Sequence, residues 1–153
     1  MKTILIAGLP GSGKTFLAKV LKQELERKNY KVEWFNADRV REKYNDWDFS
    51  TSGRHRQMTR MKILADKAKA NGSYVICDFV CPTKQLRKDF AADFVVWMNT
   101  IDEGRFEDTN QIFEPLDSHE YQVIVTKHEW WNALFSNQWS YEIIRRLETN
   151  AKL

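Results

Sequence analysis

The sequence predicts an α/β domain in three layers, with a mostly parallel five-stranded sheet that carries helices on both faces. Two observations lead to this prediction. Short runs of β-branched and apolar residues alternate with longer segments of helical periodicity. The chain of 153 residues, 42% of them hydrophobic, is also long enough to bury one core. Because parallel strands need long crossovers, the helical segments between the runs supply them.

The expected strands are the five short apolar runs Thr3–Ala7, Lys31–Phe35, Ser73–Asp78, Phe94–Met98 and Tyr121–Val125. Apolar spacings of three and four predict helices over Lys14–Lys28, Arg54–Ala70 and Lys84–Phe90. The tryptophan-rich segment Glu129–Leu147 predicts a closing helix or helix pair, and we favour packing on the sheet over an aromatic ligand or partner surface. With no Gly/Ser-rich linker or repeat in view, we expect residues 1–153 to form one domain.

The composition argues against several functional classes. The 24 lysines and arginines exceed the 21 acids by only three, which is too few to indicate nucleic-acid or membrane binding by themselves. Cys77 and Cys81 lack the Cys-x-x-Cys spacing and the three histidines are scattered, so we expect neither a zinc site nor a disulfide framework. No apolar run approaches the roughly 20 residues of a membrane span. We therefore expect a cytoplasmic protein.

The most specific motif is GLPGSGKT, residues 8–15, which satisfies Gly-x4-Gly-Lys-[Ser/Thr]. It lies between an expected strand and an expected helix, the context that a P-loop requires. Its glycines let the backbone turn successive N–H groups inward, so that the loop and the helix end cradle an oligophosphate. The predicted ATP site consists of Gly8, Pro10, Gly11, Ser12, Gly13, Lys14 and Thr15. Lys14 would reach the β- and γ-phosphates, and the Thr15 hydroxyl would hold Mg²⁺.

Two aspartates follow strands at the same edge of the expected sheet. Asp78 ends the third strand and Asp38 follows the second. A kinase needs an anion that supports the metal and a group that orients or deprotonates the attacking hydroxyl. We interpret Asp38 as the candidate base, and Thr15, Asp38 and Asp78 as candidate metal ligands. For Asp38, a cap on the following turn is the structural alternative.

Five arginines lie between residues 39 and 60. Planar guanidinium groups suit a phosphate or sulfate, and we choose Arg41, Arg54 and Arg60 as candidates for binding the acceptor. A solvated basic face is the alternative for each of them.

The segment after the fourth strand, residues 100–116, is polar and lacks helical periodicity. Such a segment is typical of a mobile cover over the phosphates. From this cover Arg105 can stabilise charge on the transferring phosphoryl group, and an exposed loop arginine without a role is the alternative.

Together these features resemble the adenylylsulfate kinase family of P-loop enzymes, which phosphorylate the 3′-hydroxyl of adenosine 5′-phosphosulfate with MgATP. The resemblance runs from about Lys2 to Val125. The family's Asp-Gly-Asp-x-x-Arg stretch corresponds to residues 36–41, and its Gly-Phe-Ser to residues 48–50. The resemblance implies a P-loop kinase fold and the cofactors ATP and Mg²⁺. It also implies an acceptor site at Asp38, Arg41, Phe49, Arg54, Gln57 and Arg60.

The sequence departs from the family at three places. Asn36 replaces the first acid, Cys81 replaces a serine, and the long lid is reduced to something around residues 102–106. These departures concern the acceptor and leave the phosphoryl donor untouched.

Other acceptors and partners stay open. The pattern Asn-x-Asp-x-x-Arg also resembles polynucleotide and modified-base DNA kinases, so a polynucleotide, nucleoside or modified-base DNA kinase is the alternative, with Tyr44, Trp47 and Phe49 available to stack a base. A nucleotide-dependent switch is less favoured, because Glu129 stands where a guanine-binding protein has aspartate. Related kinases are often dimers, which allows a homodimer here.

Overall fold

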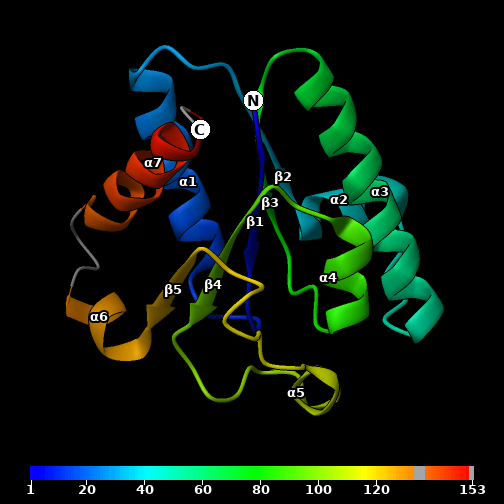
Figure 1. Cartoon of the computed structure of the whole chain (residues 1–153). Coiled ribbons are helices and arrows are strands. Elements are labelled where there is room, and N and C mark those ends of the chain that lie inside the picture. Colours follow the sequence, from blue (N-terminus) through cyan, green and yellow to red (C-terminus); the bar gives the residue numbers. More distant parts are fainter. Residues whose placement is uncertain (133–136, 152–153) are drawn as a thin grey trace.

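The computed structural model describes residues 1–132 and 137–151 (Figure 1). At its centre lies a five-stranded sheet in which every neighbouring pair is parallel. The strands, in chain order, are β1 (Thr3–Ala7), β2 (Val32–Asn36), β3 (Tyr74–Asp78), β4 (Phe94–Asn99) and β5 (Val123–Thr126). Their spatial order is β2-β3-β1-β4-β5, so β1 occupies the middle of the sheet. This arrangement confirms the predicted fold class.

Helices cover both faces of the sheet (Figure 1). They are α1 (Lys14–Arg27), α2 (Ala37–Tyr44), α3 (Thr51–Ala70), α4 (Lys84–Phe90), α5 (Glu107–Ile112), α6 (Lys127–Asn132) and α7 (Gln138–Ala151). The helices α1 and α7 lie on one face, and α3 and α4 lie on the other. None of these helices is both long enough and apolar enough to cross a bilayer.

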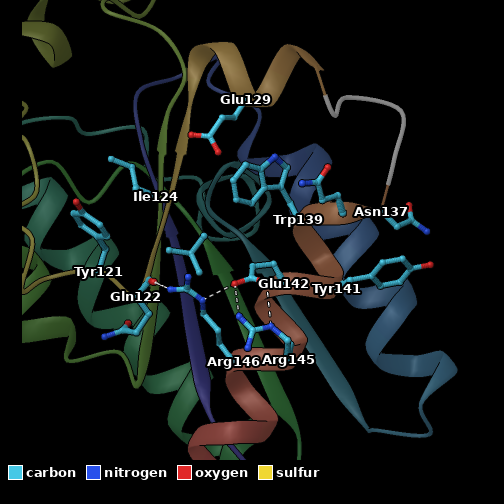
Figure 2. Close-up of a pocket in the computed structure, with 12 residues that line it drawn as sticks. Tyr121, Gln122, Ile124, Glu129, Asn137, Trp139, Tyr141, Glu142, Arg145 and Arg146 are labelled. Atoms are coloured by element: carbon cyan, nitrogen blue, oxygen red, sulfur yellow. Dashed lines mark hydrogen bonds and ion pairs between the residues drawn. The ribbon is translucent and has the colours of Figure 1, made fainter.

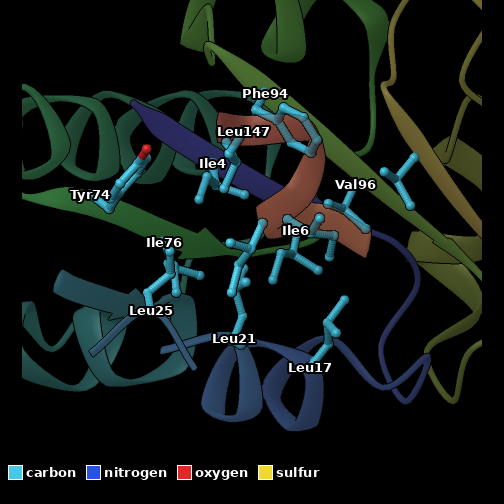
Figure 3. Close-up of a cluster of buried hydrophobic side chains, with 14 of the residues drawn as sticks. Ile4, Ile6, Leu17, Leu21, Leu25, Tyr74, Ile76, Phe94, Val96 and Leu147 are labelled. Atoms are coloured by element: carbon cyan, nitrogen blue, oxygen red, sulfur yellow. The ribbon is translucent and has the colours of Figure 1, made fainter. Parts of the chain in front are cut away.

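Each face of the sheet has its own apolar cluster, because successive side chains of a strand point to opposite sides. Ile4 and Ile6 pack with residues of α1 and α7 such as Leu21 and Leu147 (Figure 3). Leu5 and Ala7 pack instead with α3 and α4 residues, among them Met58, Met61 and Phe90. The central strand β1 is therefore completely buried, and the loop that follows it starts from a fixed position.

Two helices were not expected from the sequence. In α2 most side chains are polar and only Val40 and Arg41 are buried, so apolar periodicity could not reveal it. Its start is defined by Asn36, whose side chain accepts a hydrogen bond from Arg39 N at the helix N-terminus. The expectation of an irregular segment over residues 100–116 is corrected by α5, which has one buried residue, Thr109.

The tryptophan-rich end forms a helix pair, α6 and α7, which was one of the two predicted forms. Trp130, Ile143, Ile144 and Leu147 join the apolar cluster on the α1 face, as the packing interpretation requires, whereas Trp131 of the same segment is 61% exposed and does not. Leu134 and Phe135, which belonged to the same prediction, lie outside the described residues. Cys77 and Cys81 are free and buried.

Candidate active site

The phosphate loop joins the buried end of β1 to the start of α1. Gly11 and Gly13 have φ angles of 86° and 101°, which favour glycine over residues with a Cβ. A Cβ at Gly13 would lie 2.8 Å from the Trp130 ring, so α6 packs directly against the loop. On its other side the Thr100 hydroxyl donates a 2.6 Å hydrogen bond to the Ser12 carbonyl. Contacts from α6 and from the segment after β4 therefore hold the loop in place.

Lys14, the first residue of α1, turns back over this loop. Its Nζ atom donates a 2.9 Å hydrogen bond to the Leu9 carbonyl. Burial lowers the pKa of the Lys14 ammonium to about 8, although the charges of Asp78 and Asp38 oppose that shift. The lysine is thus a cation that is held in a partly dehydrated position, which suits it to bind an anion.

A compact polar group lies beside Lys14 at the ends of β2 and β3. The in-register pairing of these strands places Asn36 opposite Asp78. Asn36 Nδ2 donates to Asp78 Oδ1 at 3.0 Å and to Thr15 Oγ1 at 3.3 Å. Burial raises the pKa of Asp78, whose side chain is 2% exposed, and the hydrogen bonds from Asn36 and Thr15 oppose that rise. The structure therefore brings together two of the three predicted metal ligands, Thr15 and Asp78.

The third, Asp38, lies in the first turn of α2 and is exposed. It lines the same cavity as Lys14, and its charge acts on the Lys14 ammonium. Within residues 1–132 and 137–151, no cluster of three or more His, Cys, Asp or Glu side chains is arranged to hold a metal ion.

A cavity of about 320 Å³ connects these groups. Its lining contains the phosphate loop, the acids, two arginines and several aromatic rings: Pro10, Gly11, Lys14, Thr15, Asn36, Ala37, Asp38, Trp47, Phe49, Arg54, Asp78, Phe79, Val80, Arg105, Phe106 and Thr109. Trp47, Phe49 and Phe106 are about half exposed, although large aromatic side chains are usually buried. The cavity thus offers cations for an anion and flat apolar surfaces for a ring.

Arg105 enters this cavity from the segment between β4 and α5. Two hydrogen bonds between Gly104 and Asn110 connect this segment to α5. Gly104 N donates to Asn110 Oδ1 at 2.7 Å, and Asn110 Nδ2 donates to the Gly104 carbonyl at 3.0 Å. A Cβ at Gly104 would lie 3.1 Å from Pro10, so the segment packs on the phosphate loop. Arg105 is exposed, and its guanidinium lies 5.5 Å from the Phe106 ring centre.

Arg54 connects the cavity to α5. Its side chain is 8% exposed, and it donates to the Phe49 carbonyl at 2.9 Å and to the Thr109 hydroxyl at 3.1 Å. Asp108 lies 3.7 Å from the same guanidinium. Neither Thr109 nor Phe106 was singled out as a binding residue from the sequence, because only the packing of α5 on α3 brings them to the cavity.

The other predicted acceptor residues are placed differently. Arg41 and Gln57 line a smaller recess of about 70 Å³ that shares Asp38, Phe49 and Arg54 with the main cavity. Arg41 donates to the carbonyls of Asp46 and Asp48, and it therefore holds the turn after α2. Gln57 Nε2 donates to the Ala37 carbonyl at 2.9 Å, while its buried Oε1 atom has no partner in the described part of the chain.

Arg60 does not reach the cavity. It forms an ion pair of 2.8 Å with Asp46 and lies over the Tyr44 ring. The same Asp46 also accepts hydrogen bonds from Arg56. The charge of Arg60 therefore already has a partner, and its role in binding the acceptor stays a prediction.

The turn that carries Trp47 and Phe49 depends on a close approach by Gly53. A Cβ at Gly53 would overlap the carbonyl oxygen of Asp48. Ser50 defines the start of α3 at this point, and its hydroxyl accepts a hydrogen bond from Gly53 N at 3.2 Å. Gly53 was not among the residues predicted from the sequence, and a glycine in the first turn of a helix is the one local signal for it.

We expect Gly53→Ala to destabilise the protein by about 2 to 3 kcal/mol, because the methyl group must displace the Asp48 backbone. Gly72→Ala is the matched control. Gly72 has a φ of 86°, and no atom would lie within 4 Å of a Cβ there, so only backbone strain of about 1 kcal/mol is expected. Urea unfolding of both variants measures the difference. A cost at Gly53 no greater than that at Gly72 would contradict the close approach.

A larger cavity, of about 930 Å³, lies elsewhere (Figure 2). It is formed by the edge strand β5 and the helices α6 and α7, and no residue of the phosphate loop lines it. Its charged groups are largely paired with one another, since Glu142 accepts hydrogen bonds from Arg145 and Arg146 and Arg146 donates to the Gln122 carbonyl. Size alone therefore does not identify the candidate active site.

Sequence comparison gives a family. The model of the family described as adenylylsulphate kinase matches residues 1–100. A probable adenylyl-sulfate kinase of Aeropyrum pernix is 39% identical over 83 residues, which is 54% of this chain and 45% of that protein. The adenylyl-sulfate kinase of Bacillus licheniformis is 34% identical over 85 residues, which is 55% of this chain and 43% of the relative. The match thus spans about half the length of these curated relatives.

Structural comparison shows the same fold in several kinases. The Mycobacterium tuberculosis APS kinase in complex with AMPPNP and APS superposes with a TM-score of 0.72 at 20% identity, covering 96% of this chain and 97% of that chain. A gluconokinase from Sinorhizobium meliloti superposes with a TM-score of 0.66 at 12% identity, covering 99% and 95%. At these identities the likeness concerns the fold.

Proposed function

Because the chain belongs to the adenylylsulphate kinase family, we propose that it transfers the γ-phosphoryl group of MgATP to a hydroxyl of an anionic, nucleotide-like acceptor. Adenosine 5′-phosphosulfate is the first candidate for that acceptor. The observation that carries the proposal is the cavity in which the phosphate loop, two carboxylates and two arginines meet. Transfer between phosphates and a hydroxyl needs positioning and charge stabilisation, and these groups supply both.

On the donor side, the backbone N–H groups of the loop and the N-terminus of α1 would bind the β- and γ-phosphates. Lys14 would leave its hydrogen bond to the Leu9 carbonyl and contact the phosphates instead. Arg105, which comes from the segment packed on Pro10, would stabilise the charge on the transferring group.

The side-chain oxygens of Thr15, at the start of α1, and of Asp78, at the end of β3, fit Mg²⁺. This ion prefers oxygen ligands, and it is usually held by one or two carboxylates together with substrate phosphates. The Thr15 hydroxyl and the Asp78 carboxylate would hold it, since both contact the same Asn36 amide. When bound, the ion neutralises charge on the phosphates.

On the acceptor side, Asp38 would orient the attacking hydroxyl and accept its proton, because it lines the cavity that Lys14 also lines. Arg54 would bind the anionic group of the acceptor, and Phe49 would contact its ring. Arg41 and Gln57 would contact the acceptor through the adjoining recess.

A nucleic-acid or nucleoside kinase is the second candidate. The half-exposed Trp47 ring in the cavity favours it, because an exposed indole is a good stacking surface for a base. The test is an acceptor panel with labelled ATP that includes adenosine phosphosulfate, nucleosides and a 5′-hydroxyl oligonucleotide. Labelling of adenosine phosphosulfate supports the first candidate. Labelling of the oligonucleotide alone, with an affinity that falls steeply with salt, would replace it with the second.

Nucleotide binding should also take up a proton. With a pKa of about 8, half of the Lys14 side chains are neutral at pH 8, and bound phosphates raise the pKa so that they become protonated. Calorimetry of MgADP binding in buffers of different ionisation enthalpy should therefore show an uptake of about half a proton at pH 8 and nearly none at about pH 6.5, where the lysine is already charged. Equal uptake at both pH values would contradict the assigned role of Lys14.

The setting of the protein belongs to the same proposal. A kinase that uses ATP is expected in the cytoplasm, and a homodimer is the assembly that the family resemblance suggests. Light scattering of the purified protein tests the assembly directly.

A further inference from the structure

Asn36 is in contact with Thr15, Asp78 and the start of α2, and these contacts give its amide a defined use. It is the last residue of β2 and also the N-cap of α2. The register of β2 and β3 places it directly opposite Asp78, whose own strand neighbours β1. Asn36 therefore lies between the acidic end of β3 and the first turn of α1.

The hydrogen bonds of Asn36 determine which way its amide faces. Its Oδ1 atom accepts from Arg39 N at 3.1 Å and so caps α2. Its Nδ2 atom then faces the opposite way, where it donates to Asp78 Oδ1 at 3.0 Å, Asp78 Oδ2 at 3.3 Å and Thr15 Oγ1 at 3.3 Å. The two Asp78 oxygens belong to a carboxylate and can only accept, so an amide nitrogen satisfies them and a second carboxylate would not.

We infer that Asn36 is a positioning residue that joins the Thr15 hydroxyl to the Asp78 carboxylate and thereby sets how strongly nucleotide binding depends on Mg²⁺. This inference rests on the proposed function. An aspartate at the same position would place two carboxylates side by side on paired strands, next to a nearly fully buried Asp78. Two adjacent carboxylates repel each other and the phosphates, and a divalent cation relieves that repulsion.

Two substitutions of Asn36 separate the role of its Nδ2 atom as a hydrogen-bond donor from the role of its Oδ1 atom as the N-cap of α2. Asn36→Asp keeps the size and the N-capping oxygen but replaces the donor with a negative oxygen. Asn36→Ser also keeps an N-capping oxygen, and it replaces the amide donor with a shorter hydroxyl group without adding charge. Asn29→Asp, at the distant end of α1, controls for the change in net charge.

The experiment is calorimetric titration of each protein with ADP, once with excess Mg²⁺ and once with EDTA. The quantity compared between proteins is the Mg²⁺ ratio, which is the affinity for ADP with Mg²⁺ divided by the affinity for ADP with EDTA. We expect Asn36→Asp to weaken Mg-free ADP binding by about tenfold and to recover much of that loss with Mg²⁺, so its ratio rises. We expect Asn36→Ser to leave Mg-free binding nearly unchanged and to lower the ratio by about tenfold, the size of one hydrogen bond to a charged group.

Opposite shifts in the two variants, with no shift in Asn29→Asp, would support the inference. Shifts in the same direction, or none, would overturn it while leaving nucleotide binding by the natural protein intact. If the natural protein binds ADP under neither condition, the proposed function itself is wrong. Thermal unfolding without nucleotide shows whether each variant is folded, and Asn36→Thr replaces the serine variant if that one is not.

Discussion

Replacement of Lys14 with alanine is expected to lower the rate of phosphoryl transfer by about 10³-fold or more. The lysine amine lies 2.9 Å from the Leu9 carbonyl, directly against the turn of the phosphate loop. Without it, the charge that develops on the transferring oxygens loses a fixed partner in a partly dehydrated site. Initial rates with labelled ATP and the best acceptor of the panel measure the effect.

The fold should survive this change. Lys14 belongs to neither apolar cluster, and its pKa of about 8 lies below the 10.5 of an unperturbed lysine. The unfolded chain therefore holds the lysine proton more tightly than the folded protein does. At about pH 7 the charged Lys14 lowers the free energy of unfolding, and this cost is relieved only as the pH rises above about 8. Lys14→Ala should accordingly unfold at the same temperature as the natural protein or a higher one. Lys19→Ala, an exposed position on the same helix, is the control, and turnover of Lys14→Ala equal to that of this control would refute the phosphate-loop assignment.

The second large effect is expected at Asp38. Asp38→Asn keeps the shape of the side chain and removes its ability to accept a proton, so the turnover number should fall by about 10²-fold. Affinity for MgADP should change little, because Asp38 lies in the first turn of α2 and not in the phosphate loop. Steady-state kinetics and calorimetry on the same preparation separate these two quantities.

Glu42→Gln is the matched control for Asp38→Asn. Glu42 is an exposed acid on the same helix, and it does not line the cavity. It should leave the turnover number unchanged. If Asp38→Asn instead raises KM for ATP while the turnover number stays constant, Asp38 binds the nucleotide and does not act as the base.

The contrast between Arg54 and Arg60 shows how far the sequence could lead at the acceptor site. Both arginines were chosen for their positions on one helix, and both suit an anion. Arg54 lies against α5 through Thr109, which is 55 residues away, whereas Arg60 is paired with Asp46. No spacing within α3 distinguishes the two, because their partners come from other parts of the chain. Their roles in binding stay predictions.

The sequence by itself determined the phosphate loop and the parallel α/β architecture, since both depend on neighbouring residues: glycines that permit unusual φ angles, and apolar runs whose length and period select strands or helices. Only the tertiary structure decided that Asn36 contacts Asp78, that Trp130 packs on Gly13 and that α5 completes the cavity. These contacts join residues far apart in the chain. They depend on the order and register of the strands. The burial of whole helices and sheet faces selects that order and register, and no short motif encodes it.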